Sequence, residues 1–277
     1  MGGVTRSSRQ VRDLLSEHGL TPSRALGQNF VADPNTVRRI ARLAHIVPGD
    51  RVVEIGAGLG SLTLALVEAG AEVTAVELDR HVLPALRHVV EPHGVRVVHG
   101  DALFLDWDEV LGEGPWSLVA NLPYNVATGL VLDLLAGVPA IERMLVMVQR
   151  EVGERLAARV GDKAYGIPSV KRAYWATAEV VARVPATVFI PPPRVESVLV
   201  RIVRRPRPAV DADPGRLFAL VEKAFGQRRK MLRRSLAGVV DAETFARAGV
   251  RPEARAEEVS LEGWAQLANA DVGRWRP

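Results

Sequence analysis

Three glycines and two acidic residues stand at the ends of expected strands, where a nucleotide-like ligand could bind. In VVEIGAGLGSLTLAL, Gly56, Gly58 and Gly60 lie between an expected strand and an expected helix. Glycines let the backbone turn tightly and approach a ligand closely, and the helix N-terminus adds N–H donors. Glu77 ends the next expected strand and can accept hydrogen bonds from both hydroxyls of a ribose. Asp101, at the end of the third, can accept a hydrogen bond from an adenine amino group.

The spacing of the glycines favours one class of cofactor. A dinucleotide-binding loop has the pattern GxGxxG, whereas this loop is GxGxG and follows Glu54. The spacing therefore favours S-adenosylmethionine over NAD, although the ribose acceptor suits either. A glycine-rich turn flanked by solvated acids is the alternative without a ligand. Three strand ends in register argue against it.

The sequence NLPY follows the fourth expected strand and could position an aromatic amine. Such an amine is a poor nucleophile because its lone pair is delocalised into the ring. The Asn121 side chain and the Leu122 carbonyl could hold both hydrogens of adenine N6 and turn the lone pair toward a methyl donor. Pro123 would stiffen the turn, and Tyr124 could stack on a base that has left its helix. Methyl transfer from a sulfonium depends mainly on alignment, so no strong base is needed. A turn whose tyrosine packs in the core is the alternative.

The elements that must position these groups form an alternating pattern. Short β-branched runs alternate with helical stretches, two of which close on Gly70 and Gly137. This pattern predicts an α/β, Rossmann-like sheet of parallel strands with helices on both faces. Two later runs lack a full crossover helix and predict an antiparallel pair at the sheet edge. The parallel strands are expected at 51–55, 71–77, 95–100, 116–121 and 143–149, and the edge pair at 178–184 and 196–205.

The segment RRPRPAVDADPG (204–215) has neither helical nor alternating periodicity and predicts a linker. We therefore expect a cofactor-binding domain over residues 1–205, with an N-terminal extension at 1–30. A small all-helical domain is expected over 206–277.

Charge is uneven along the 277 residues, although the formal net charge is only +4. Residues 50–113 hold twelve acids against four bases, whereas residues 201–234 hold eleven bases against three acids. A basic module indicates a polyanionic partner for the second domain. We expect QRRKMLRR (227–234) to be helical and to anchor a phosphate backbone, with Arg229 and Arg233 on one face and Lys230 and Arg234 on the next. An ordinary solvated helix face is the alternative.

Composition also bears on metal chemistry, membranes and location. The chain has no cysteine and its histidines are scattered, so we expect no metal site. No window approaches the roughly 18 uninterrupted apolar residues of a membrane span, so we expect no membrane association. The polar N-terminus lacks an export signal, which favours the cytoplasm.

Eight motifs together resemble a known family. The chain is similar over nearly its full length to the ribosomal RNA adenine N6-dimethyltransferases, in the branch acting on the small subunit. The motifs stand in family order: LGQNFV, EIGAGLG, NLPYNVAT, QREVGERLAA, KAYGIPSV, FIPPPRVESVLVR, FGQRRKMLRRSL and RAEEVSLEGWAQLAN.

The resemblance implies roles that the residues alone did not give. It implies that Asn29 and the backbone of Val31 join the glycine loop, Glu77, Asp101 and Asn121 around S-adenosylmethionine. It also implies that Phe189 faces Tyr124 across the target base; from sequence alone, a core phenylalanine is equally plausible. The substrate implied is two adjacent adenosines in a 16S rRNA hairpin loop of small-subunit precursors, bound by a monomer. The charge of the QRRKMLRR segment, rather than the resemblance, makes Arg228, Arg229, Lys230, Arg233 and Arg234 the expected RNA-binding residues.

Two other functions remain open. The first is a large-subunit (23S) rRNA adenine methyltransferase of the macrolide-resistance type. Those relatives typically carry Ile where Leu122 stands and lack the tail motifs QRRKMLRRSL and RAEEVSLEGW. The second is a non-catalytic RNA-binding assembly factor on the same fold, against which the intact glycine loop, Asn121 and Tyr124 argue.

Overall fold

The computed structural model describes residues 5–23 and 26–270. Contacts between Cα atoms divide the chain into two compact units. Unit 1 comprises Met1–Gly153 and Glu179–Arg204, and unit 2 comprises Glu154–Ala178 and Arg205–Pro277. The expected extension at 1–30 and the expected domain at 206–277 each include positions outside the described residues, namely 1–4, 24–25 and 271–277.

Unit 1 is built on a seven-stranded sheet in the order β4-β3-β2-β5-β6-β9-β7. The first five strands of this order pair in parallel, and β9 pairs antiparallel with β6. The predicted α/β, Rossmann-like fold is confirmed, and the two later runs lie at the sheet edge as β9 and β7. The strands are β2 (Arg51–Ile55), β3 (Glu72–Glu77), β4 (Arg96–His99), β5 (Trp116–Asn121), β6 (Ile141–Gln149), β7 (Ala176–Val184) and β9 (Ser197–Arg204).

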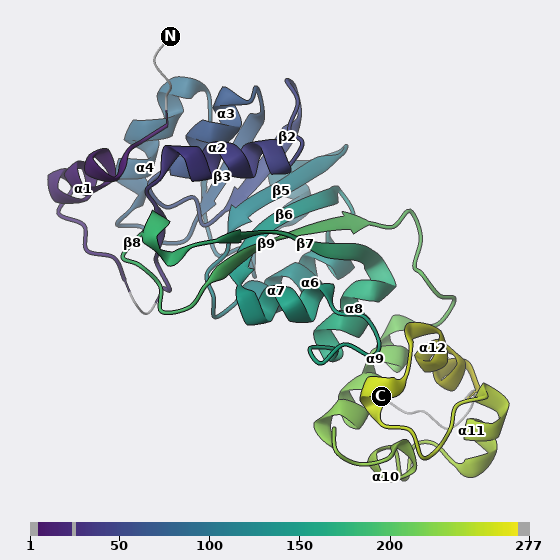
Figure 1. The fold of residues 1–277 in the computed structure, drawn as a ribbon. Helices are drawn as coiled ribbons and strands as arrows, with labels where there is room; N and C mark the ends of the chain where they lie inside the picture. The colour runs from purple at the N-terminus through teal and green to yellow at the C-terminus, as the bar shows by residue number, and fades with distance from the viewer. Residues whose placement is uncertain (1–4, 24–25, 271–277) are drawn as a thin grey trace. The chain divides into compact units, whose positions relative to one another are not determined.

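Helices cover both faces of this sheet (Figure 1). On one face lie α2 (Pro34–Leu43), α3 (Ser61–Glu68) and α4 (Leu83–Val90), and α6 (Ala127–Gly137) lies on the other. The strand order reverses between β2 and β5, where α/β sheets open a crevice at the carboxyl ends of the strands. The remaining elements of unit 1 include α1 (Ser8–Glu17), η1 (Glu91–His93), α5 (Trp107–Leu111), η2 (Ala186–Val188) and the start of α7 (Arg150–Ala157).

The helix ends show one agreement with the sequence and one difference. Gly70 follows α3 with φ of 92°, the left-handed conformation expected there. Gly137 is instead the last residue of α6, and the helix ends at Val138 with φ of −124°. The Val138 N–H still bonds to the Leu134 carbonyl at 3.0 Å, so no left-handed residue is needed.

A second, two-stranded sheet joins distant parts of unit 1. Strand β1 (Phe30–Val31) pairs antiparallel with β8 (Phe189–Ile190), so that Val31 lies opposite Phe189. The motifs LGQNFV and FIPPP are thereby brought together.

Unit 2 is helical, apart from the first residues of β7. Its helices are α8 (Ile167–Trp175), α9 (Pro214–Gly226), α10 (Leu232–Ser235), η3 (Ala256–Glu258), α11 (Ala242–Ala248) and α12 (Leu261–Ala270), with the end of α7. Leu217 and Trp264, both 0% exposed, lie in its hydrophobic core. No helix or strand spans residues 205–213, as the linker prediction requires.

The division of the chain differs from the expected single boundary, because residues 154–178 belong with the C-terminal helices. The Tyr165 hydroxyl donates to the Val259 carbonyl at 2.9 Å, and the Tyr174 hydroxyl donates to the Ala212 carbonyl at 2.8 Å. Both rings also lie in the core of unit 2. The chain passes between the units three times, and a linker composition marks only the last passage, after Arg204, so the two earlier passages left no sequence signal.

Candidate functional site

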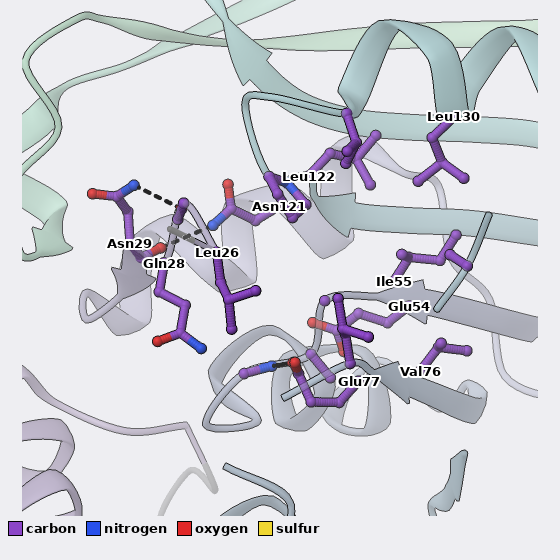
Figure 2. Close-up of a pocket in the computed structure, with 18 of the residues that line it drawn as sticks. Leu26, Gln28, Asn29, Glu54, Ile55, Val76, Glu77, Asn121, Leu122 and Leu130 are labelled. Carbon is purple, nitrogen blue, oxygen red and sulfur yellow. Dashed lines mark hydrogen bonds between the residues drawn. The ribbon is translucent and has the colours of Figure 1, made fainter. Parts of the chain in front are cut away.

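A pocket opens at the carboxyl ends of the parallel strands of unit 1 (Figure 2). Ten of the sequence-predicted site residues line it, and Glu54 lines it as well. Phe189 is not among the lining residues. The ten are Asn29, Val31, Gly56, Gly58, Glu77, Asp101, Asn121, Leu122, Pro123 and Tyr124.

The glycine loop is held close to its neighbours at Gly58. This residue has φ of 55°, and a Cβ there would lie 2.9 Å from ring carbons of Phe30. Its N–H donates to Glu77 Oε2 at 2.7 Å. A side chain at position 58 would therefore push into the β1 segment and strain the backbone, which explains the glycine.

Glu77 is held in one orientation by two backbone donors. Gly58 N–H binds one carboxyl oxygen, and the Asp79 N–H binds the other at 2.9 Å. Glu77 is 7% exposed, and burial raises the pKa of its carboxyl group, although the backbone hydrogen bonds oppose the shift. Gln28 Nε2 also donates to Asp79 Oδ2 at 2.7 Å, which ties the LGQNFV segment to this wall.

Glu54 is a second buried acid of the pocket, and no role was predicted for it. It is 2% exposed, and its carboxyl group accepts a hydrogen bond from the Thr63 hydroxyl. Burial raises its pKa from 4.5 to about 8; the Thr63 hydrogen bond opposes the shift, and the charge of Glu77 adds to it. Two buried acids beside one pocket suit a ligand that carries positive charge. The signal in the sequence was an acid placed between the apolar residues Val53 and Ile55 of an expected strand.

Asp101 lies at the third strand end, as predicted. It is partly buried and lines the pocket, and its Oδ1 accepts from the Leu103 N–H at 3.0 Å. The carboxylate is thus fixed by its own loop while one oxygen remains for a ligand.

Asn121 is oriented by the N-terminal segment. Its Nδ2 donates to the Asn29 carbonyl at 3.0 Å, and Asn29 Nδ2 donates to the Gly27 carbonyl at 3.0 Å (Figure 2). The bond fixes the orientation of the Asn121 amide, whose Oδ1 is the atom that can accept from a substrate. Leu122 N–H donates to the Met147 carbonyl at 3.1 Å and anchors the turn to β6.

Tyr124 and Phe189, the two aromatic residues expected to hold the target base, differ in their surroundings. Tyr124 is partly buried at the pocket wall, and its hydroxyl lies 2.8 Å from Ser197 Oγ. Burial raises the pKa of the Tyr124 hydroxyl, so the ring is neutral. Phe189 is 3% exposed and packs in the hydrophobic core of unit 1. Phe189 is also absent from the pocket lining, so the expected clamp of two facing rings stays a prediction.

The predicted helix over QRRKMLRR is wrong. Helix α9 ends at Gly226, and α10 begins only at Leu232. Between them the chain turns away because Leu232 N–H donates to the Ala254 carbonyl at 2.8 Å and Arg233 N–H donates to the Pro252 carbonyl at 3.0 Å. The argument from residues sharing a helix face does not hold for this segment.

The basic side chains of this segment are exposed, but they are not equivalent. Arg228 pairs with Glu257 at 2.7 Å, and Arg233 lies 3.8 Å from Glu253. Among the described residues, no ion pair is found for the remaining three, which are Arg229, Lys230 and Arg234.

Two of the eleven bases counted in residues 201–234 stabilise unit 1. Arg204 donates to four backbone carbonyls at and beyond the end of α6, and Arg201 pairs with Glu179 at 2.7 Å. The contrast in charge between the two parts of the chain therefore overstates the surface free for a polyanion.

Within the described ranges, no group of three or more His, Cys, Asp or Glu residues is placed to hold a metal ion. Across those same ranges, no helix is both long enough and apolar enough to cross a membrane.

Comparison with known proteins decides the family. Residues 20–270 match the family described as ribosomal RNA adenine dimethylase. The chain belongs to this family. The predicted enzyme class, an rRNA adenine N6-dimethyltransferase, is confirmed by this membership.

Close relatives of this dimethylase carry one name. The chain is 47% identical over 272 residues to "Ribosomal RNA small subunit methyltransferase A" of Kineococcus radiotolerans, covering 95% of this chain and 90% of the relative. It is 47% identical over 269 residues to the protein of the same name from Thermobifida fusca, with 93% of each chain covered.

Two solved structures share the fold. The crystal structure of the 23S rRNA methyltransferase ErmE matches with a TM-score of 0.68 and 28% identity, over 87% of this chain and 99% of that one. A dimethyladenosine transferase from Plasmodium falciparum matches with a TM-score of 0.73 and 22% identity, over 86% and 95%.

Proposed function

We propose that this dimethylase transfers methyl groups from S-adenosylmethionine to N6 of two adjacent adenosines in a 16S rRNA hairpin loop, within precursors of the small ribosomal subunit. The observation that carries the proposal is the orientation of Asn121. Its amide nitrogen is bound to the Asn29 carbonyl, so its oxygen is the group left to accept from an amine.

The residues that line the pocket support S-adenosylmethionine as the cofactor. Gly58 leaves room for the Phe30 ring beside the loop, and Glu77 is fixed where an acid can accept from ribose hydroxyls. Glu54 and Glu77 offer two buried acids to a cofactor that carries an ammonium and a sulfonium group. Asp101 would accept from the adenine amine, and Asn29 and Val31 would close the pocket from the N-terminal side. The chemistry that the bound cofactor supplies is an electrophilic methyl group.

The NLPY turn would prepare the amine for attack. Asn121 Oδ1 and the Leu122 carbonyl would each accept one N6 hydrogen, which draws the lone pair out of the ring. Tyr124 would stack on the base and hold its plane. The proton lost from N6 after transfer can pass to solvent, because alignment rather than a strong base dominates the barrier.

The exposed cations of unit 2 would bind the RNA backbone. Arg229, Lys230 and Arg234 are the strongest candidates because no acid of the described chain neutralises them. Arg228 and Arg233 would first have to leave Glu257 and Glu253. Such contacts position a folded RNA without reading its sequence.

The macrolide-resistance alternative rests on the likeness to ErmE. That likeness is 28% identity, whereas the relatives named for the small subunit reach 47% over more of the chain. The non-catalytic alternative has no support in the site, since Asn121, Tyr124 and the glycine loop all line one pocket.

The proposal is tested by offering the purified protein labelled S-adenosylmethionine with small or large ribosomal subunits from cells that lack this gene. Dimethyladenosine in 16S rRNA is the expected product. Asn121→Ala serves as the inactive control, because it removes the acceptor. Label in 23S rRNA alone would instead support the resistance type.

A further inference from the structure

The ring of Tyr124 is attached to the protein at both of its ends. Its backbone belongs to the turn that follows β5, and its hydroxyl lies 2.8 Å from the hydroxyl of Ser197. The two residues are 73 positions apart in sequence. Without this bond, a half-buried ring on a turn could rotate about its side-chain torsions.

Ser197 is itself rigidly placed. It is the first residue of β9, is 0% exposed and lies opposite Gln149 in the antiparallel pair with β6. The preceding carbonyl, of Glu196, accepts from the Arg150 N–H at 2.9 Å. The serine hydroxyl therefore offers a fixed point for the tyrosine.

We propose that Ser197 is a positioning residue for methyl transfer, which sets the plane of the Tyr124 ring through the bond between the two hydroxyls. This inference rests on the proposed function. Since the target base stacks on the ring, the ring plane decides how adenine N6 is aimed at the methyl group. A small error in that alignment lowers the rate of the chemical step more than it lowers affinity.

A purely structural role for Ser197 makes different predictions. A buried hydroxyl needs a hydrogen-bond partner, and the Tyr124 hydroxyl supplies one whether or not a base ever binds. In that case, loss of the bond lowers thermal stability but leaves turnover unchanged at temperatures where the protein is folded.

The test compares Ser197→Ala, Tyr124→Phe and the double variant, with small subunits from cells lacking this gene as substrate. Ser117→Ala is the matched control, because Ser117 is a buried serine near the start of β5, outside the pocket lining. Melting temperatures show which variants are folded. Tyr124→Phe keeps the packed ring and tests the bond even if Ser197→Ala fails to fold.

We expect each single variant to lower kcat about tenfold, the rate equivalent of one hydrogen bond, with KM for the subunit and for S-adenosylmethionine changed by less than about twofold. The double variant should lose no more than either single variant, because both remove the same bond. Wild-type kcat in Ser197→Ala, or multiplying losses in the double variant, would overturn the inference. If the wild-type protein itself made no dimethyladenosine, the proposed function would fail instead.

Discussion

The side-chain amide of Asn121 donates to the backbone carbonyl of Asn29 at 3.0 Å, although 92 residues separate the two. The bond joins the N-terminal LGQNFV segment to the end of β5. It fixes which edge of the amide faces the pocket, and it couples the cofactor wall to the transfer site.

Asn121→Ala should abolish most methyl transfer. The variant loses the acceptor for N6 and the bond to Asn29, so we expect kcat to fall by on the order of 100-fold, as when one preorganised polar group is removed from an active site. Asn121→Asp should also be impaired, because it sets a carboxylate oxygen against the Asn29 carbonyl. The rate at which each variant methylates small subunits measures both effects. Asn35→Ala, an exposed asparagine on α2, is the control, and near-normal turnover in Asn121→Ala would refute the assigned role.

Glu77→Ala should weaken binding of S-adenosylmethionine. Two lost hydrogen bonds to a charged acceptor correspond to about 2 to 4 kcal/mol of binding free energy. The loss also frees the Gly58 and Asp79 amides that Glu77 now holds. Calorimetry measures the change, with Glu72→Ala, an exposed acid at the start of the same strand, as the control. Unchanged affinity in Glu77→Ala would show that the ribose lies elsewhere.

Local sequence patterns were sufficient for the strands that build the pocket. The run RVVEI is β2, and WSLVAN is β5, because β-branched and apolar residues buried on both faces leave a clear signal. The same signal placed Glu77, Asp101 and Asn121 at neighbouring strand ends. The position of Asn29 could not be predicted this way, since it depends on the pairing of Phe30–Val31 with Phe189–Ile190, a contact that no local periodicity encodes.

The cofactor-free protein should lose stability as pH rises from about 4.5 to about 8. Burial raises the pKa of Glu54 from 4.5 to about 8, so across this window the folded state holds a proton that the unfolded state has released. Stability falls with pH wherever the folded state binds more protons, and it levels off above the folded pKa. Glu77 is shifted in the same direction and adds to the decline.

Thermal unfolding across this pH range measures the effect. We expect the melting temperature to fall by on the order of 5 °C across this range. In Glu54→Gln the decrease should be smaller. A melting temperature that rises through the window in the wild-type protein would show that these acids are charged in the folded state.

Reversing the charge of Arg229 and Lys230 should weaken binding to small subunits. Arg229 with Arg233 was the pair suggested by a continuous helix; the structure favours Arg229 with Lys230, because Arg233 lies near Glu253. The double change to Glu should reduce the slope of log affinity against log salt by roughly one to two. Arg39→Glu with Arg42→Glu, on exposed positions of α2, matches the change in net charge. Equal losses in both double variants would indicate a general charge effect.

The helix expected over QRRKMLRR shows where sequence reasoning failed. The residues favour a helix, but the amides of Leu232 and Arg233 bond to carbonyls of residues 252–254, some twenty positions away. Tertiary hydrogen bonds of this kind override intrinsic propensity. The proposed role of Ser197 could not be predicted from the sequence for a similar reason, since it depends on the contact of its hydroxyl with the Tyr124 hydroxyl.

The most direct test of the proposed function is to map methylated adenosines by mass spectrometry in 16S and 23S rRNA from cells with and without this gene. We expect two adjacent dimethyladenosines in one hairpin loop of 16S rRNA, present with the gene, absent without it and not restored by Asn121→Ala. Identical 16S rRNA from both cells, or a difference confined to 23S rRNA, would contradict the proposed function.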